Sequence, residues 1–270
     1  MPCLSHATAG VGRGWGFGFH EAMDQIGAVT GPLIVAAVLY FQGGYREGFA
    51  VLLLPAVLAL MVIAAAARLY PHPQHLEVST PKLETKGLHR PYWLYVAAVG
   101  LIGAGYADFP LIAYHFAKGG IAAPNWIPIF YAVAMGVDAV AALILGRWFD
   151  RLGMPVIIAT AGVSAFFAPL VFLGGFHLAL LGMALWGLGM GAQESIIKAA
   201  LAQMVPRDRR ATGYGLFHAG FGLCWFLGSA LMGMLYDISL TALIGFSVIV
   251  QLLALPVFLR VSNSACFITR

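Results

Sequence analysis

Carboxylic acids lie inside several long apolar runs of this sequence, where ionisable side chains are rare and costly. Asp138 has no neighbouring charge within residues 135–140. Its carboxyl must therefore be either protonated or paired with a group on another helix, because a lone carboxylate is expensive to bury. A carboxyl at membrane depth that gains and loses a proton is what proton-coupled transport needs. Asp138 is thus a candidate proton site, and structural pairing between helices is the alternative.

A second acid, Asp108, lies beside Pro110 in another apolar run, near Tyr106, Tyr114 and His115. Proline should break or kink a helix there. Broken helices expose backbone groups at the binding sites of transporters. Asp108 is therefore a candidate for binding a substrate or a proton. The alternative is a polar residue that caps a broken helix end.

Glu194 and Lys198 are four residues apart, which places them on one helical face with the acid N-terminal, the favourable order for an ion pair. The pair either neutralises itself to lower the cost of insertion or faces a cavity. His218, in the next apolar run, can titrate near neutral pH. The alternative for His218 is a hydrogen-bonded packing residue.

The string H-E-A-M-D at residues 20–24 superficially resembles the zinc motif H-E-x-x-H, but Asp24 stands at the second histidine position. No further pattern of histidines or acids supports a metalloprotease. We interpret His20, Glu21 and Asp24 as residues that snorkel or bridge to a neighbouring helix, with a coupling role as the alternative. The sequence predicts no metal, no cofactor and no enzymatic activity.

The composition defines the elements that must position these residues. Of the 270 residues, 61% are hydrophobic and 10% are charged, against about 25% charged in a typical soluble domain. The mean hydropathy is +0.87. A soluble globule of this size needs a charged surface that this chain lacks. The expected class is an all-α, polytopic membrane protein embedded in a lipid bilayer.

About 20 apolar residues are needed to cross the hydrocarbon core as a helix. Eight segments meet this length, and the boundary between the fifth and the sixth is the least certain: 15–40, 48–69, 92–117, 124–147, 154–175, 177–204, 211–236 and 239–260. The polar, proline-containing stretch 71–91 predicts a linker between two helices and six.

The basic residues indicate the orientation. If the first span runs from inside to outside, 12 basic residues fall in inside segments, and only Arg46 and Lys118 fall outside. This bias follows the positive-inside rule and predicts cytoplasmic termini in the cell membrane. It also accounts for the net charge of +4, so we expect no nucleic-acid partner.

The first span carries a glycine motif. Gly18, Gly27, Gly31 and Pro32 follow the spacing G-x8-G-x3-G-P, which resembles the antiporter motif in the fifth helix of the major facilitator superfamily; residues 35–36 are Val-Ala where that motif has Gly-Gly. Independently of the family, Gly27 and Gly31 form a small-xxx-small stripe that lets another helix approach, and Pro32 should bend the helix. The motif favours export.

A second resemblance lies between the fourth and fifth spans. Gly146, Asp150, Arg151 and Gly153 match the cytoplasmic gating loop of the same family, and residues 206–215 resemble the loop before its eleventh helix. The resemblance implies that Asp150 faces a helix N-terminus, where an anion gains about 0.3–1 kcal/mol.

Aligned on these motifs, the eight spans correspond to the fifth to twelfth helices of a twelve-helix transporter, without the first four. The implied division is 1–70, the last two helices of an N-terminal bundle; 71–91, a cytoplasmic linker; and 92–270, a six-helix bundle. The sixth span then places Gln193, Glu194 and Lys198 on the central cavity.

The expected function is secondary transport of a small solute by alternating access, with coupling to protons through Asp108, Asp138 and Glu194 as a further hypothesis. The substrate is not defined by the sequence. The alternative is a truncated or mis-started fragment without transport of its own, whose missing N-terminal segment or a second chain would complete the pathway.

Overall fold

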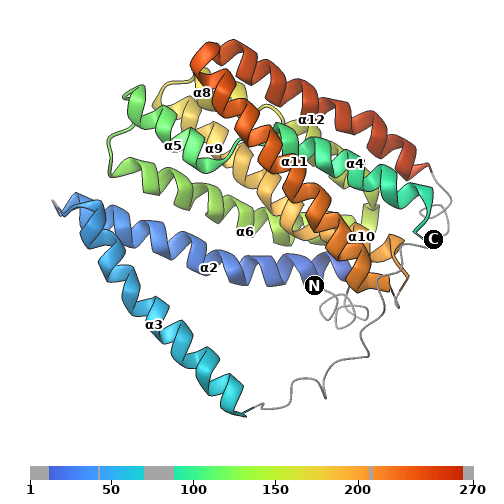
Figure 1. Cartoon of the computed structure of the whole chain (residues 1–270), viewed down its shortest axis with the longest axis horizontal. Coiled ribbons are helices and arrows are strands. Elements are labelled where there is room, and N and C mark those ends of the chain that lie inside the picture. The colour runs from blue at the N-terminus through green and yellow to red at the C-terminus, as the bar shows by residue number, and fades with distance from the viewer. Residues whose placement is uncertain (1–11, 42, 70–87, 207–208, 264–270) are drawn as a thin grey trace.

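The computed structural model describes residues 12–41, 43–69, 88–206 and 209–263, and within these ranges every regular element is a helix (Figure 1). In chain order the helices are α2 (Arg13–Tyr40), α3 (Tyr45–Leu69), α4 (Arg90–Gly105), α5 (Phe109–Lys118), α6 (Trp126–Leu152), α7 (Met154–Ser164), α8 (Phe167–Leu173), α9 (Phe176–Gly191), the π-helix η3 (Ala192–Ile196), α10 (Ile197–Met204), α11 (Arg210–Ile238) and α12 (Leu240–Ser262).

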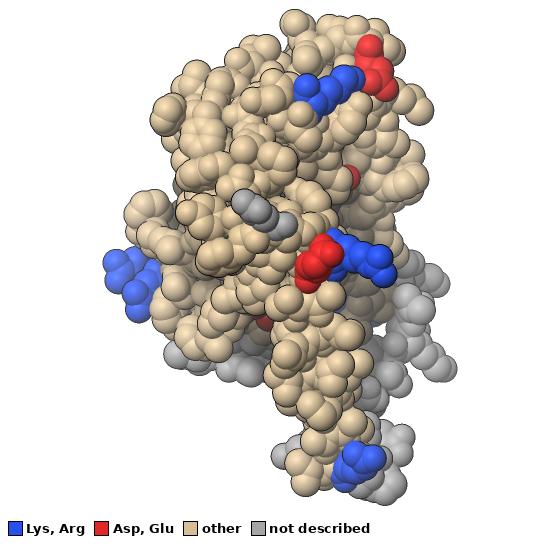
Figure 2. Space-filling view, turned by 90° about the vertical axis from the view of Figure 1, so that its left-hand side faces the viewer, with Lys and Arg blue, Asp and Glu red and all other residues tan. Residues whose placement is uncertain are grey.

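The described helices form eight apolar spans long enough to cross a membrane. Three spans are broken helices: α4 with α5, α7 with α8, and α9 with η3 and α10. The prediction of eight spans is confirmed within a few residues at most ends, including the uncertain boundary, where α8 ends at Leu173 and α9 begins at Phe176. Figure 2 shows a face that is mostly uncharged, as a lipid-embedded surface requires.

One predicted boundary is wrong by about a turn and a half. The fourth span was expected to end at residue 147, but α6 continues to Leu152. The chain offers no helix breaker before Gly153, whose φ of 71° lies in the left-handed region that glycine tolerates. Most of the motif at 146–153 is therefore the last part of a helix, and only its final glycine leaves the helical conformation.

The spans from α4 to α12 pack into one body, with α4 against α11 and α12 and with α6 against α9 (Figure 1). Their buried side chains form two apolar clusters, one built around Tyr95 and Phe258 and the other around Phe116 and Phe130. The close packing of these aromatic rings fixes the relative positions of the helices.

The two N-terminal helices are arranged differently. α2 lies along α6, whereas α3 stands away from the body, and of its described residues only Gly48 is buried (Figure 1). Most of the predicted linker at 71–91 lies outside the described residues. The domain division therefore stays a prediction.

The predicted helix break near Pro110 is confirmed, because α4 ends at Gly105 and α5 begins at Phe109. Backbone carbonyls freed by the break need donors in an apolar interior. Gly105 O accepts bonds from Ser247 Oγ at 2.6 Å and from Gln251 Nε2 at 3.0 Å, both on α12. The break is thus held by side chains of a neighbouring span.

Candidate functional site

The close contact between α2 and α6 begins with small residues at the N-terminal end of α2. A Cβ built on Gly18 would lie 2.9 Å from the carbonyl carbon of Ala142, and one built on Gly146 would lie 2.8 Å from that of Gly14. Gly14 and Gly18 on α2, and Ala142 and Gly146 on α6, each form a small-xxx-small pair. Such pairs let two backbones approach closely within a membrane. We call this contact the α2–α6 seam.

Polar side chains continue the seam toward the middle of both helices. Gln25 Nε2 donates to Glu21 Oε1 at 2.7 Å and to Asp138 Oδ2 at 3.0 Å. These three side chains are buried, with exposed fractions of 6% for Glu21, 7% for Gln25 and 0% for Asp138. One amide therefore bridges two carboxyl groups from different helices.

The π-helix η3 brings a third element to the same place. A Cβ on Gly191, just before η3, would lie 2.7 Å from the carbonyl oxygen of Asp138, so only glycine allows this approach. The predicted ion pair is confirmed, because Lys198 Nζ donates to Glu194 Oε2. Both side chains interact electrostatically with Glu21 and Asp138. π-Helical turns frequently occur at functional sites.

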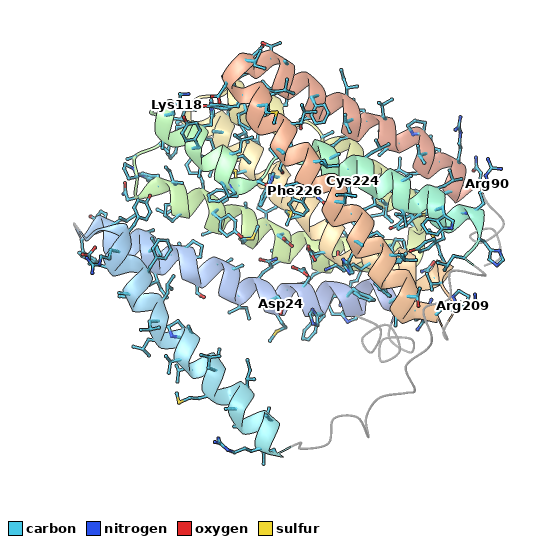
Figure 3. The ribbon with its side chains drawn as sticks, in the orientation of Figure 1. Asp24, Arg90, Lys118, Arg209, Cys224 and Phe226 are labelled. Carbon is cyan, nitrogen blue, oxygen red and sulfur yellow. The ribbon has the colours of Figure 1, made fainter. Side chains whose placement is uncertain are left out.

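Glu21, Gln25, Asp138, Glu194 and Lys198 are called the polar cluster below. Figure 3 shows side-chain oxygen atoms between α2 and α6, where the seam lies. Within the described residues, Gln25 Oε1 and Asp138 Oδ1 are buried without a hydrogen-bond partner. A native structure leaves few such atoms, and each one calls for an explanation.

Two other predicted site residues border the cluster. His218 of α11 interacts electrostatically with Lys198 and Glu194. Its ring stacks on the Tyr214 ring, with the two ring centroids 6.3 Å apart. Gln193 is buried and donates to Gly189 O at 3.1 Å, while its own side-chain oxygen has no partner among the described residues. His218 therefore lies next to the ion pair of Glu194 and Lys198, and Gln193 precedes that pair in η3.

Tyrosines from two further helices hold the chain around η3. Tyr95 of α4 donates its hydroxyl to Ile197 O at 2.8 Å, and Tyr214 of α11 donates to Lys198 O at 2.8 Å. A π-turn disturbs the regular backbone bonding of a helix, and these hydroxyls satisfy carbonyls just after it. They fix the position from which Lys198 reaches the cluster.

Asp108 is not bonded to the polar cluster. It occupies the N-cap position of α5 without capping the helix through its side chain, and its carboxylate accepts a bond from Trp225 Nε1 on α11 instead. Tyr106, two residues earlier, lies near Trp225 and interacts electrostatically with Asp138. The aromatic side chains of Trp225 and Tyr106 thus lie next to Asp108 and Asp138 respectively.

The gating motif lies at the end of the seam where α2 begins. Asp150 accepts bonds from the backbone N–H groups of Gly14 and Trp15, both at 2.8 Å. The Arg147 guanidinium lies over the Trp15 ring, with its Cζ 4.0 Å from the ring centroid. Arg151 lines an open pocket together with Trp15, Arg147 and Asp150. The expected position of Asp150 at a helix N-terminus is confirmed, and the gating role stays a prediction.

The later part of the glycine motif has no partner in the described structure. Apart from the neighbouring residues of α2 itself, no atom of the described residues lies within 4 Å of a Cβ built on Gly27 or Gly31, and Pro32 lies inside α2. The helix contact expected at Gly27 and Gly31 therefore stays a prediction. Of the motif, Gly18 makes the observed close approach.

The side chains of the zinc-like string lie close together, with ligand atoms of His20, Glu21 and Asp24 within 4.8 Å of one another, but they differ in burial. His20 Nδ1 and Asp24 Oδ2 pair at 3.3 Å and are exposed, whereas Glu21 is buried against Gln25. Asp24 lies about midway along α2 (Figure 3). The interpretation of Glu21 as a residue that bridges to another helix agrees with this geometry.

Sequence reasoning missed Gln25, which connects the cluster, and did not select Glu21 as a site residue. A signal was present in the spacing. Gly14, Gly18, Glu21 and Gln25 follow one another at intervals of four, three and four residues. That spacing continues one helical face from small residues into polar ones.

Comparisons with known proteins agree with this architecture. The family model described as "Major Facilitator Superfamily" matches residues 1–229 and, in a second overlapping match, residues 125–265. An uncharacterized protein of Mycobacterium tuberculosis is 36% identical over 259 residues, which are 93% of this chain and 63% of that protein. An uncharacterized MFS-type transporter of Methanocaldococcus jannaschii is 28% identical over 239 residues, 84% of this chain and 58% of that protein.

A solved structure shows the same fold. The crystal structure of a bacterial homologue of the iron transporter ferroportin, in an outward-facing state, superposes with a TM-score of 0.57 and 16% identity over 70% of this chain and 49% of that one. The eight apolar helices define a multi-pass membrane protein. The chain belongs to the Major Facilitator Superfamily of transporters, and it spans about 63% of the length of its mycobacterial relatives.

Proposed function

We propose that this chain acts in secondary transport of a small solute across the cell membrane by alternating access, with coupling to protons and in the direction of export. The proposal is carried by the burial of Asp138. This residue is fully buried at the α2–α6 seam, and Gln25 bridges it to Glu21. Ionisable groups at membrane depth mark ion and substrate pathways. Burying an ionised carboxylate there without a partner would be costly, so the Asp138 carboxyl is suited to binding a proton.

The proposed helix correspondence follows from the order of the motifs. In it, α2 and α3 are the fifth and sixth helices of the family fold, and the spans from α4 to α12 are the seventh to twelfth. The seam then joins the two halves of the transporter, and its opening and closing would alternate access to the central cavity.

The proposed orientation places both termini in the cytoplasm, because the 12-to-2 distribution of basic residues follows the positive-inside rule. The end of the seam near Gly14 and Gly146 then faces the cytoplasm, where Asp150 caps α2. This end is closed by backbone contact. In the proposed cycle it opens when the cavity faces inward, so Asp150 would act as a latch.

A transport assay tests the proposal. The chain is reconstituted in liposomes that contain a trapped pH-sensitive dye, a pH gradient is imposed, and amino acids, sugars and organic amines are added in turn. We expect at least one solute to dissipate the gradient with the wild-type chain and not with Asp138→Asn, because an amide cannot carry the proton.

Asp24→Asn is the matched control, since Asp24 is an exposed acid on the same helix as Glu21. It should transport as the wild type does. Gradient-driven transport that is unchanged in folded Asp138→Asn would remove Asp138 from the mechanism.

The alternative is a fragment without transport of its own. The same assay addresses it, because a chain that moves no solute of any class would contradict the proposal and favour that alternative. Co-reconstitution with a second chain that restores movement would then identify the missing part.

A further inference from the structure

The bridge between α2 and α6 has an incomplete set of hydrogen bonds. The amide nitrogen of Gln25 has two N–H donors, and both are used, one by Glu21 and one by Asp138. Gln25 Oε1 and Asp138 Oδ1 remain as buried acceptors without a donor among the described residues. The group that would complete this bridge must therefore be a donor.

The opposite orientation of the Gln25 amide leads to the same requirement. If its oxygen faced Glu21 and Asp138, both carboxyl groups would need a proton to make a bond, because an ionised carboxylate is only an acceptor. In either orientation, fully ionised Glu21 and Asp138 leave buried oxygens without a hydrogen-bond donor among the described residues. At least one proton resolves this conflict.

The charges around the bridge do not neutralise it. Besides Glu21 and Asp138, Glu194 and Lys198 face it from η3 and α10, and the hydroxyls of Tyr106 and Tyr131 approach Asp138 from α4's C-terminal end and from α6. Lys198 is bonded to Glu194.

Two further groups add to this balance. Asp24, exposed on α2 and paired with His20, also interacts electrostatically with Glu21, and His218 of α11 interacts with Glu194 and Lys198. With all acids ionised, three carboxylates share one ammonium in a buried site. An unpaired buried charge is strongly disfavoured.

We propose that Glu21 and Asp138 form one proton-binding site, in which the two carboxyls share a single proton while α2 and α6 are packed together and Gln25 positions them. The bound proton lies on one carboxyl and donates to an oxygen that has no other donor. When α2 separates from α6 and water enters, the O–H bond breaks, the proton leaves to water, and the bridge becomes a pair of carboxylates.

The carboxylates repel each other, so the deprotonated bridge favours separated helices and the protonated bridge favours packed ones. Proton binding at Glu21 and Asp138 then stabilises the packed state of the α2–α6 seam. The meaning of this site for transport rests on the proposed function, but the binding of the proton can be measured without any transported solute.

The test is infrared difference spectroscopy of the full chain in lipid vesicles between about pH 6, where exposed Asp and Glu side chains are already ionised, and alkaline pH. A protonated carboxyl shows a C=O stretching band that an ionised one lacks, and the band shifts in heavy water. We expect such a band in the wild type at acidic pH and its loss at alkaline pH. Glu21→Gln and Asp138→Asn should each remove it, because the new amide supplies N–H donors in place of the proton.

Asp24→Asn and Asp108→Asn are the controls, and both should retain the band. Absence of a titrating band in the wild type, or its persistence in both Glu21→Gln and Asp138→Asn, would overturn the proposal. Its loss in only one of the two would assign the proton to that carboxyl alone and so overturn the shared site. A variant that elutes as an aggregate is replaced by Gln25→Glu, whose third carboxyl should strengthen the band and whose unchanged spectrum would contradict the proposal.

Discussion

Gln25 shows how much a single side chain can determine in an apolar protein. Its amide connects two carboxyls on different helices, and these contacts lie where water is excluded. A hydrogen bond to a charged or buried group contributes more there than at a surface, and an unpaired group costs more. The polar part of the α2–α6 contact therefore depends on one residue that has no charge of its own.

Replacement of Gln25 by leucine, which has a similar size, should lower the stability of the chain. It removes both N–H donors and leaves Glu21 and Asp138 without a bridge, at a cost of about 1–3 kcal/mol. Thermal unfolding in detergent measures the effect.

Thr30→Val on the same helix is the comparison, because the exposed Thr30 hydroxyl bonds only to backbone of its own helix. Equal melting temperatures of Gln25→Leu and Thr30→Val would show that the bridge contributes nothing to stability.

The sequence identified part of this site for a physical reason. Asp138, Glu194 and Lys198 stand out because charges are rare in apolar runs. The i,i+4 spacing of Glu194 and Lys198 predicted the ion pair that the structure contains. Gln25 carries no charge, so composition does not distinguish it. Only the packing of α2 on α6, which no local pattern specifies, reveals that it faces Asp138.

At the scale of elements, the closest backbone contacts between α2 and α6 are made at glycine. Gly18 lies against the backbone of Ala142, and Gly14 against that of Gly146. Phe17 of α2 is also buried, in an apolar cluster that includes residues of α6. Separation of the two helices would expose this ring, whereas the glycine contacts themselves bury no large side chain.

Gly18→Val tests the contact at this scale. The added side chain would meet the Ala142 backbone, and overpacking of this kind costs about 1–3 kcal/mol. We expect α2 to detach from α6, with faster hydrogen–deuterium exchange along α2 as the measured result.

Gly27→Val is the matched control, since, apart from the neighbouring residues of α2 itself, no atom of the described residues lies within 4 Å of its new Cβ. Slow exchange along α2 in both variants would contradict the observed contact.

Helix breaks illustrate what sequence patterns can and cannot predict. Pro110 predicted the break between α4 and α5, because proline lacks an N–H and restricts the residue before it. The π-helix at Ala192–Ile196 has no such marker and arises where Gly191 lets the chain approach Asp138. Its position depends on tertiary packing, which the local sequence does not encode.

At the scale of the whole molecule, the predicted eight spans and the all-helical fold are confirmed for the described residues. Hydropathy predicts spans well because every backbone polar group in a bilayer must be bonded within the chain. The arrangement of the spans is less accessible to sequence. That α3 stands apart while α2 lies on α6 follows from contacts between distant residues (Figure 1).

The molecule is expected to have two states. In one, the seam is packed and the Glu21–Asp138 site holds a proton, and in the other the helices are apart and the site is ionised. A ligand or proton shifts such an equilibrium only by its difference in affinity for the two states. Acidic pH should therefore favour the packed seam, and alkaline pH the open one.

The most direct test is the distance between α2 and α6 as a function of pH. Spin labels are placed at Phe19→Cys and Leu152→Cys, two exposed positions near the closed end of the seam, after the three native cysteines are replaced by serine. Pulsed electron paramagnetic resonance in lipid vesicles should show two distances, with the shorter one dominant at acidic pH. Asp138→Asn should show the shorter distance at every pH, whereas a single distance that does not change with pH in the otherwise wild-type chain would contradict the account.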